Sequence, residues 1–305
     1  MNRHPFILFL TMSRPMFVVA GMLFYALGAG IARYLGYGLD PGSYWLGQLL
    51  VSSIQLTAHY LNEYFDRDAD IENNNRSLFS GGSGVLGDGE GKIPEQFALL
   101  AAASALTVSA IAFIGLGRMG VLNNAVHLIV ILALLGAILY SLPPVRLVSS
   151  GFGELVASVI LANLVPALAF ILQSQEWHRL IAMTTFPLTA LALATILSFE
   201  FPDYATDIKF AKRTLLVRLG WKQAIRFHAA FLLAAYSIMA LSAYQGLPRA
   251  IAIPPLLTMP LALLQIWLFR GIEEGQKPNW LALTSTSVAN TILVAYLYTY
   301  SFWTR

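Results

Sequence analysis

The sequence predicts an all-α membrane protein, a bundle of nine transmembrane helices. Three observations support this fold class. Of the 305 residues, 57% are hydrophobic and only 11% are charged, whereas an ordinary soluble domain carries roughly 25% charged residues. The mean hydropathy is positive. The apolar runs have the length of about 20 residues that a helix needs to cross a lipid bilayer.

Nine apolar segments mark the expected helices. They span 16–34, 44–63, 96–117, 124–142, 152–172, 181–201, 223–245, 250–270 and 282–303. The connections between them are too short to fold separately, so residues 1–305 are expected to form one domain. The stretch "MNRHPFILFLTMSRP" before the first segment is interrupted by polar residues and has no small-residue cleavage site. It is expected to be an interfacial helix that leads into the first span, not a removed signal.

The Lys and Arg residues predict the orientation. With the N-terminus on side one, 14 of the 19 Lys and Arg residues, including Arg3, lie on that side. By the positive-inside rule this side is cytoplasmic, and the C-terminus lies on the opposite side. We attribute the formal charge of +3 to this topology and expect no nucleic-acid partner. The long charged connections, within 62–95 and 200–222, are predicted to cap the cytoplasmic face and to carry the function.

Two acidic motifs recur along the chain. Asp66 and Asp70 in "FDRDAD" return as Asp203 and Asp207 in "FPDYATD", both shifted by 137 residues, after the second and the sixth segments. The recurrence predicts two related four-helix repeats plus one helix. Residues four apart share one face of a helix, so each pair can act together. Asn62, one turn earlier, joins the first pair.

Four carboxylates that converge at membrane depth would repel one another unless cations neutralise them. Cysteine is absent, and oxygen-only ligands suit Mg²⁺, which also binds phosphate. Two Mg²⁺ ions are therefore expected. Lys209 and Lys212 follow the second motif and Arg146 follows the fourth span, so these cations could stabilise a diphosphate leaving group. Arg76, in the first long connection, is a further candidate for substrate binding.

The membrane setting narrows the substrate. A diphosphate whose other end needs an apolar tunnel is a polyprenyl diphosphate, and its departure leaves an allylic cation that an electron-rich acceptor captures. Aromatic rings near the motifs could face that cation. Tyr64 and Tyr140 are the preferred candidates among Tyr60, Tyr64, Phe65, Tyr140, Phe199, Phe201 and Tyr204.

Together these motifs resemble the UbiA superfamily of intramembrane prenyltransferases. The resemblance covers almost the whole chain and is carried by Arg14-Pro15, "NEYFDRDAD", "YSLPPVR" and "DYATDIKFAKRTLLVRLG". It implies a nine-helix fold around a central cavity, two Mg²⁺ ions between the motifs and the diphosphate, and a lateral opening for lipid.

Carried over position by position, the resemblance assigns roles to individual residues. The aspartates would hold the metals (Asp66, Asp70, Asp203 and Asp207). Arg146 and Lys212 would bind the diphosphate, and Asn62 the polar head of the acceptor or the first metal. One departure is that "FEFPD" has Phe199 where relatives often have Asn. Either Glu200 takes over the polar role, or the acceptor binds differently on that side.

The sequence identifies the acceptor less closely than the prenyl donor. The stretch "NNNRSLFSGGSGVLGDG" is closer to members that prenylate 1,4-dihydroxy-2-naphthoate for menaquinone than to those acting on 4-hydroxybenzoate. The alternatives are 4-hydroxybenzoate, homogentisate, a porphyrin or a glycerol phosphate.

Three rival functions remain. An ion-coupled transporter also carries repeats and intramembrane acids, although usually near the bilayer midplane. A phosphatidyltransferase would need an Asp-Gly-x2-Ala-Arg signature that is missing here. A catalytically silent quinone binder is the third.

Two other features have simple structural interpretations. The stretch "SGGSGVLGDGEG" lacks the Lys-Ser/Thr of a P-loop and is expected to be a flexible cap. His59 is expected to be a packed residue, not a ligand.

Overall fold

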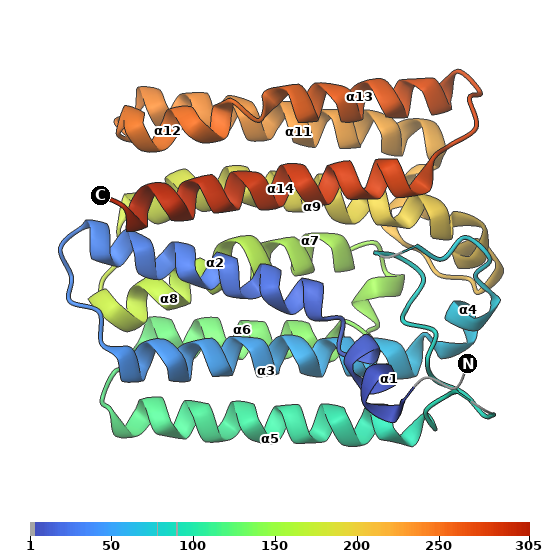
Figure 1. The fold of residues 1–305 in the computed structure, drawn as a ribbon, viewed down its shortest axis with the longest axis horizontal. Coiled ribbons are helices and arrows are strands. Elements are labelled where there is room, and N and C mark those ends of the chain that lie inside the picture. The colour runs from blue at the N-terminus through green and yellow to red at the C-terminus, as the bar shows by residue number, and fades with distance from the viewer. Residues whose placement is uncertain (1–3, 78, 90) are drawn as a thin grey trace.

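The computed structural model describes residues 4–77, 79–89 and 91–305. Arg3, and Leu78 and Glu90 of the predicted cap, lie outside the described residues. Within them the secondary structure is helical, with no strand and one isolated bridge between Leu86 and Ile93. The predicted all-α class is therefore confirmed (Figure 1).

The long helices run side by side, and consecutive long helices run in opposite directions (Figure 1). The elements are α1 Pro5–Met12, α2 Pro15–Tyr34, α3 Pro41–Phe65, α4 Arg67–Glu72, α5 Gln96–Arg118, α6 Asn124–Leu139, a 3₁₀ turn Leu147–Ser149, α7 Gly153–Val159, a π-helical segment Ile160–Leu164, α8 Val165–Ser174, α9 Arg179–Lys209, α10 Leu215–Leu219, α11 Trp221–Tyr244, α12 Arg249–Leu256, α13 Met259–Glu273 and α14 Trp280–Trp303.

Each of the nine predicted segments overlaps long helical structure. Seven helical segments of the described chain are long and apolar enough to span a membrane: Pro15–Tyr34, Gln96–Arg118, Gly153–Ser174, Arg179–Lys209, Trp221–Tyr244, Arg249–Glu273 and Trp280–Trp303. Of the other two, α6 is apolar but has 16 residues, and α3 has 25 residues but carries polar side chains such as Gln48, Gln55 and His59. The count of nine spans and the two-repeat architecture stay predictions.

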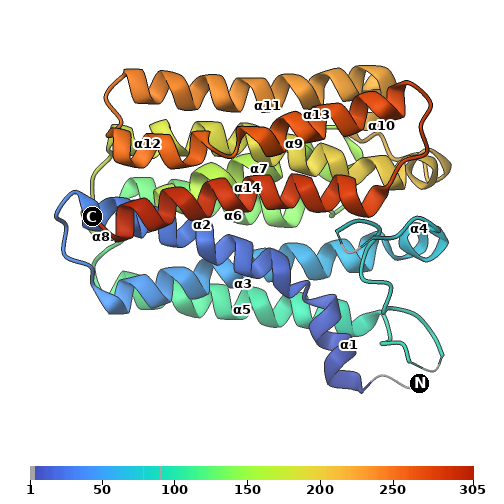
Figure 2. The same cartoon turned by 45° about the horizontal axis from the view of Figure 1, so that its top comes forward.

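The bundle is layered. In Figure 1, α11, α12 and α13 lie along one side, followed by α9 and α14, then α2, α7 and α8, then α3 and α6, with α5 at the opposite side. Figure 2 also has α11 at one side and α5 at the opposite side. The strongest packing joins α3 to α5, α9 to α11, and α2 to both α8 and α14. Large apolar side chains on the outer helices are exposed, as at Leu100 and Ile111 of α5, which is the surface expected against lipid.

Glycine permits a close contact between α2 and α8. A Cβ atom at Gly28 of α2 would overlap the backbone oxygen of Pro166 in α8. Small residues at such crossings let membrane helices approach closely. The helix that contains Pro166 changes its winding just before it, because Ile160–Leu164 is π-helical, and this segment contributes Ile160, Leu161 and Leu164 to the cavity described below.

Both acidic motifs lie at one end of the bundle. The helices α1, α4 and α10 are at this end, and the C-terminus of α14 is at the other (Figures 1 and 2). The arrangement agrees with the expected alternation of the spans. The placement of this end in the cytoplasm remains a prediction.

Candidate active site

A cavity of about 1020 Å³ runs between α2, α3, α6, the helix from α7 to α8, α9 and α14. One end is polar and is lined by Arg14, Asn62, Asp66, Asp70, Asp203, Asp207 and Lys212. The rest is mainly apolar and includes Leu23, Phe24, Val51, Ile54, Ile129, Val130, Ile160, Leu161, Leu164, Leu168, Ile196 and Ile292. The cavity therefore combines a charged head region with a long apolar wall.

The first acidic pair lies across a helix junction. Asp66 caps α3 with φ −100° and ψ 2°, and α4 begins at the next residue. The backbone N–H of Asp70 still donates to the oxygen of Asp66 at 2.9 Å, so the expected one-turn separation is kept. The sequence predicted a single helical face, whereas the structure makes a bend at Asp66.

Asp66 is almost fully buried and is surrounded by donors. Its carboxylate accepts hydrogen bonds from Arg146 Nη2 at 2.7 Å and from Asn62 Nδ2 at 2.9 Å. Lys212 Nζ lies 3.1 Å from its second oxygen. Two cations and one amide thus balance this carboxylate. Asn62, predicted to join the first motif, and Arg146 and Lys212, predicted to bind the diphosphate, are brought together at Asp66.

Asp70 lies under the loop that follows α4. Gly82, with φ +67°, packs against the Asp70 carboxylate so closely that a Cβ atom there would overlap it. Only glycine combines this φ with so close an approach. Burial, opposed by the charge of Arg14, raises the pKa of Asp70 to about 7. This carboxyl group therefore titrates near neutral pH.

The second acidic pair lies within the last turns of α9. Asp203 Oδ1 accepts a hydrogen bond from Asn73 Nδ2 at 2.6 Å, and Oδ2 accepts one from the backbone N–H of Gly81 at 3.1 Å. Asp207 Oδ1 is 3.8 Å from Lys212 Nζ. The loop after α4 thus binds the second motif while it covers the first.

Lys212 owes its position to the end of α9. The N–H of Lys212 donates to Asp207 O and the N–H of Ala211 donates to Ile208 O, with Ala211 at φ +53°. This is a Schellman motif, in which the left-handed residue is usually glycine. The reversal brings Lys212 beside Asp66 and Asp207. Burial alone would lower the pKa of Lys212, but these carboxylates outweigh burial and raise it, so the ammonium group stays charged.

Some predicted site residues lie elsewhere. Within the described residues, the cavity lining does not include Tyr64, Arg76, Arg146 or Lys209. Tyr64 packs edge-on against Phe65 at 5.1 Å. Arg76 binds the backbone oxygens of Asp70 and Gly81. Lys209 is 64% exposed and pairs with Glu72 on the outer surface, whereas Arg146 reaches the site through Asp66.

A buried ion pair that the sequence did not reveal lies beside the first motif. Arg14 Nε and Nη2 bind Glu63 Oε1 at 2.8 and 2.5 Å. Glu63 also accepts hydrogen bonds from the N–H of Ser83 at 2.8 Å and from its hydroxyl at 2.5 Å. Glu63 thus joins the start of α2, the end of α3 and the loop. The resemblance had marked Arg14, but Glu63 carried no separate signal.

Two glutamates support the segment after Lys212. Glu154 Oε1 accepts a hydrogen bond from the N–H of Leu215, and Glu200 Oε2 accepts one from the N–H of Leu216, both at 2.8 Å. Both glutamates line the cavity. Glu200 was predicted to bind substrate, and the contact it makes here is with the first turn of α10. Glu154 was missed because nothing near it in the sequence repeats the acidic motifs.

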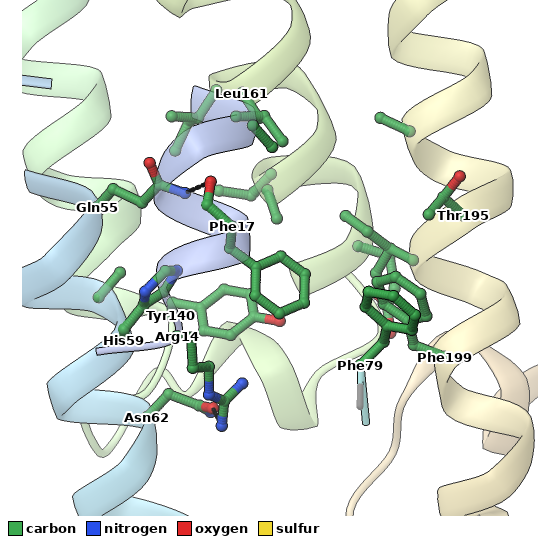
Figure 3. Close-up of a pocket in the computed structure, with 18 of the residues that line it drawn as sticks. Arg14, Phe17, Gln55, His59, Asn62, Phe79, Tyr140, Leu161, Thr195 and Phe199 are labelled. Carbon is green, nitrogen blue, oxygen red and sulfur yellow. Dashed lines mark hydrogen bonds between the residues drawn. The ribbon is translucent and has the colours of Figure 1, made fainter. Parts of the chain in front are cut away.

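Aromatic side chains form a layer inside the cavity (Figure 3). Phe79 and Phe199 stack with a centroid distance of 5.8 Å and an interplanar angle of 8°. Phe17 meets both edge-on. Tyr140, a predicted site residue, and His59 also line this part. His59 Nδ1 lies 3.3 Å from the Ser13 oxygen, as expected of a packed histidine.

The donor set at the polar end suits a hard cation. Among the described residues, no three His, Asp or Glu side chains are gathered closely enough to hold one ion by themselves. Mg²⁺ is commonly held by one or two carboxylates together with substrate phosphates and water. The four aspartates therefore fit ions that are completed by a diphosphate better than a closed protein cage.

Comparisons with known proteins agree with this architecture. Comparison with curated protein sequences finds no match. Among solved structures, a UbiA homolog from Archaeoglobus fulgidus bound to GPP and Mg²⁺ has a TM-score of 0.70 and 18% identity, covering 98% of this chain and 100% of that chain. A UbiA homolog from Aeropyrum pernix K1 has a TM-score of 0.59 and 16% identity, covering 94% and 96%.

A third solved structure, from work on digeranylgeranylglyceryl phosphate synthase in membranes, has a TM-score of 0.59 and 14% identity, covering 94% of this chain and 91% of that chain. At such identities these structures establish a shared fold. The family itself follows from the sequence, because the profile described as the UbiA prenyltransferase family matches residues 16–287. The chain therefore belongs to the UbiA prenyltransferase family and is an enzyme of that family.

Proposed function

We propose that this enzyme transfers a polyprenyl group from a polyprenyl diphosphate to an aromatic acceptor, 1,4-dihydroxy-2-naphthoate, with the help of two Mg²⁺ ions. The observation that carries the proposal is that four motif aspartates and Lys212 lie at one end of a cavity whose remaining wall is apolar. A solved relative of the same fold is bound to GPP and Mg²⁺, which supports this choice of donor and metal.

The polar end binds the diphosphate. The four motif aspartates, Asp66, Asp70, Asp203 and Asp207, would hold the Mg²⁺ ions, with Asn62 beside the first pair. The ions, when bound, neutralise the diphosphate and make it a better leaving group. Lys212, which lies between the two motifs, donates to the phosphate oxygens.

Other basic residues divide into two groups. Arg146 contacts Asp66 and is within reach of the same diphosphate. Lys209 and Arg76 act outside the cavity: Lys209 joins the end of α9 to Glu72, and Arg76 shapes the loop through its contacts with backbone oxygens. Both were expected to bind substrate, and we now propose a supporting role for them.

The apolar wall receives the polyprenyl chain, so the carbon that carries the diphosphate lies at the boundary between the polar end and the aromatic layer. Breaking its C–O bond leaves the electron pair on diphosphate and forms an allylic cation. A ring carbon of the acceptor then forms the new C–C bond. Loss of a proton, or of the carboxyl group as CO₂, restores aromaticity. Tyr140, in the cavity lining, faces this zone.

The alternatives differ in the acceptor. They are 4-hydroxybenzoate, homogentisate, a porphyrin and a glycerol phosphate. The aromatic layer next to the polar end favours a flat ring over a glycerol phosphate, since aromatic rings stack on one another. An ion-coupled transporter is set aside, because the chain belongs to an enzyme family and its paired acids lie at one end of the bundle.

The test is product formation by the purified protein in detergent. Geranylgeranyl diphosphate and Mg²⁺ are supplied with either 1,4-dihydroxy-2-naphthoate or 4-hydroxybenzoate, and the products are identified by mass spectrometry. We expect a prenylated naphthoquinol that is lost with EDTA and restored by excess Mg²⁺. Product from 4-hydroxybenzoate alone would overturn the acceptor, and EDTA-resistant turnover would overturn the metal assignment.

A further inference from the structure

The stacked aromatic pair in the cavity is not explained by diphosphate binding or by the apolar wall. We propose that Phe79 and Phe199, backed by Phe17, form a clamp that binds the flat ring of the acceptor and thereby determines acceptor specificity. This inference rests on the proposed function in one respect, namely that the acceptor is aromatic.

The three rings come from three separate parts of the chain. Phe17 belongs to the first turn of α2, Phe79 to the loop after α4, and Phe199 to α9. The rings of Phe79 and Phe199 are nearly parallel, with centroids 5.8 Å apart. Phe17 approaches them edge-on, at centroid distances of 6.4 and 6.1 Å (Figure 3). All three line the cavity.

The clamp lies next to the position of the diphosphate. Phe199 is one helical turn before Asp203 in α9, and Phe79 is two residues before Gly81, whose N–H donates to the Asp203 carboxylate at 3.1 Å. The reacting carbon of a prenyl diphosphate follows directly after its phosphate groups. A ring held at Phe79 and Phe199 is therefore close to that carbon, which is where an acceptor must be.

The geometry suits a flat ring better than a cation. A cation is attracted to the open face of an aromatic ring, but Phe79 and Phe199 turn those faces toward each other. A flat ring can enter between them in the same offset-stacked arrangement that the two rings already adopt. Admitting the ring requires Phe79 to shift; it lies in the loop after α4, where its N–H donates to Ser77 Oγ and not to a helix.

The phenyl ring of Phe199 also bears on which acceptors fit. A phenyl ring offers area for stacking and no hydrogen bond to a polar group of the acceptor. It therefore favours larger, more apolar rings, such as fused bicyclic ones, over a single phenol ring.

The experiment compares Phe199→Leu and Phe79→Leu with Phe199→Tyr, which keeps the ring. Phe186→Leu is the matched control, because Phe186 is in the same helix but is exposed. The readouts are the KM of the acceptor, the KM of geranylgeranyl diphosphate, and the dissociation constant of 1-hydroxy-2-naphthoate measured by calorimetry. Each leucine variant should weaken acceptor and probe by about 10-fold. The donor KM should stay unchanged, and Phe186→Leu should behave like wild type. Phe199→Tyr, which keeps a ring that can stack, should weaken the probe less than Phe199→Leu does.

Several outcomes would overturn the clamp: probe affinity within about twofold of wild type in both leucine variants, a rise confined to the donor KM, or a fall in kcat with unchanged probe binding. If the wild-type enzyme prenylates no aromatic acceptor, the proposed function fails, and the calorimetry still decides the clamp. Probe binding by the wild-type protein that is lost in the leucine variants then supports the clamp. Absence of probe binding by the wild-type protein overturns the clamp.

Discussion

Lys212 lies beside two of the carboxylates that we propose hold metal ions, and its replacement by methionine tests whether it competes with those ions. Its ammonium group lies 3.1 Å from Asp66 and 3.8 Å from Asp207. A pair of unit charges about 4 Å apart interacts by roughly 4 kcal/mol at an effective dielectric constant of about 20. Burial of the ammonium group offsets part of this energy. Methionine keeps an unbranched chain but removes the charge.

Two opposite effects are expected from Lys212→Met. The substrate-free protein should bind Mg²⁺ about 10-fold more tightly, because Mg²⁺ no longer has to displace the Lys212 ammonium group from the carboxylates. A gain of about 1.4 kcal/mol in binding free energy is enough for this tenfold change. Turnover with polyprenyl diphosphate should nevertheless fall by about 10² to 10³, the usual cost of removing one group that stabilises developing charge.

The assays are calorimetric titration of the substrate-free protein with Mg²⁺ and initial rates of product formation. Lys209→Met is the control, because Lys209 lies three residues earlier but is exposed and paired with Glu72. It should change both quantities by less than about twofold. Weaker Mg²⁺ binding in Lys212→Met, or wild-type turnover, would refute the reasoning. Equal effects of the two substitutions would also refute it, because the cavity position of Lys212 would then not matter.

Three further predictions concern the surrounding structure. Glu63→Gln should lower stability by about 3 kcal/mol, because it leaves the partly buried Arg14 without its counter-charge; an unchanged melting temperature in the same detergent would contradict this. Since the pKa of Asp70 is raised to about 7, protons should compete with Mg²⁺ for this carboxylate below that pH. The affinity for Mg²⁺ should therefore rise up to about pH 7 and then level off. The Asp70→Asn variant should lose this dependence of Mg²⁺ affinity on pH. Ala211→Gly should retain activity and raise the melting temperature slightly, since glycine relieves a left-handed conformation that costs other residues about 1 kcal/mol; a lower melting temperature would refute the strain.

The helical framework follows from local sequence properties. Hydropathy and segment length are visible in one dimension, so all nine apolar segments correspond to long helical structure, with ends shifted by a few residues. The spacing of the aspartates likewise identifies two one-turn pairs. The bend at Asp66 was not foreseen, because it has neither a proline nor a glycine to mark it.

The charge balance of the motif carboxylates depends on partners that are distant in the sequence. From the sequence, four converging carboxylates suggested mutual repulsion. The structure instead surrounds Asp66 with Arg146 and Lys212 and gives Asp203 two hydrogen bonds from the loop after α4. These partners lie at least 80 residues from the aspartates that they contact. The motifs marked Arg146 and Lys212 as diphosphate-binding cations, but no local pattern reveals their contacts with Asp66.

The sequence by itself determined that this protein is helical, apolar enough to span a membrane, and equipped with paired acidic motifs, because composition, hydrophobic run length and residue spacing are properties of the chain. The tertiary structure decided which side chains enter the cavity. Lys209 and Lys212 both follow the second motif closely, but the left-handed turn at Ala211 sends one outward and the other between the motifs. The aromatic clamp likewise exists only after folding, because its three rings come from segments that meet through helix packing.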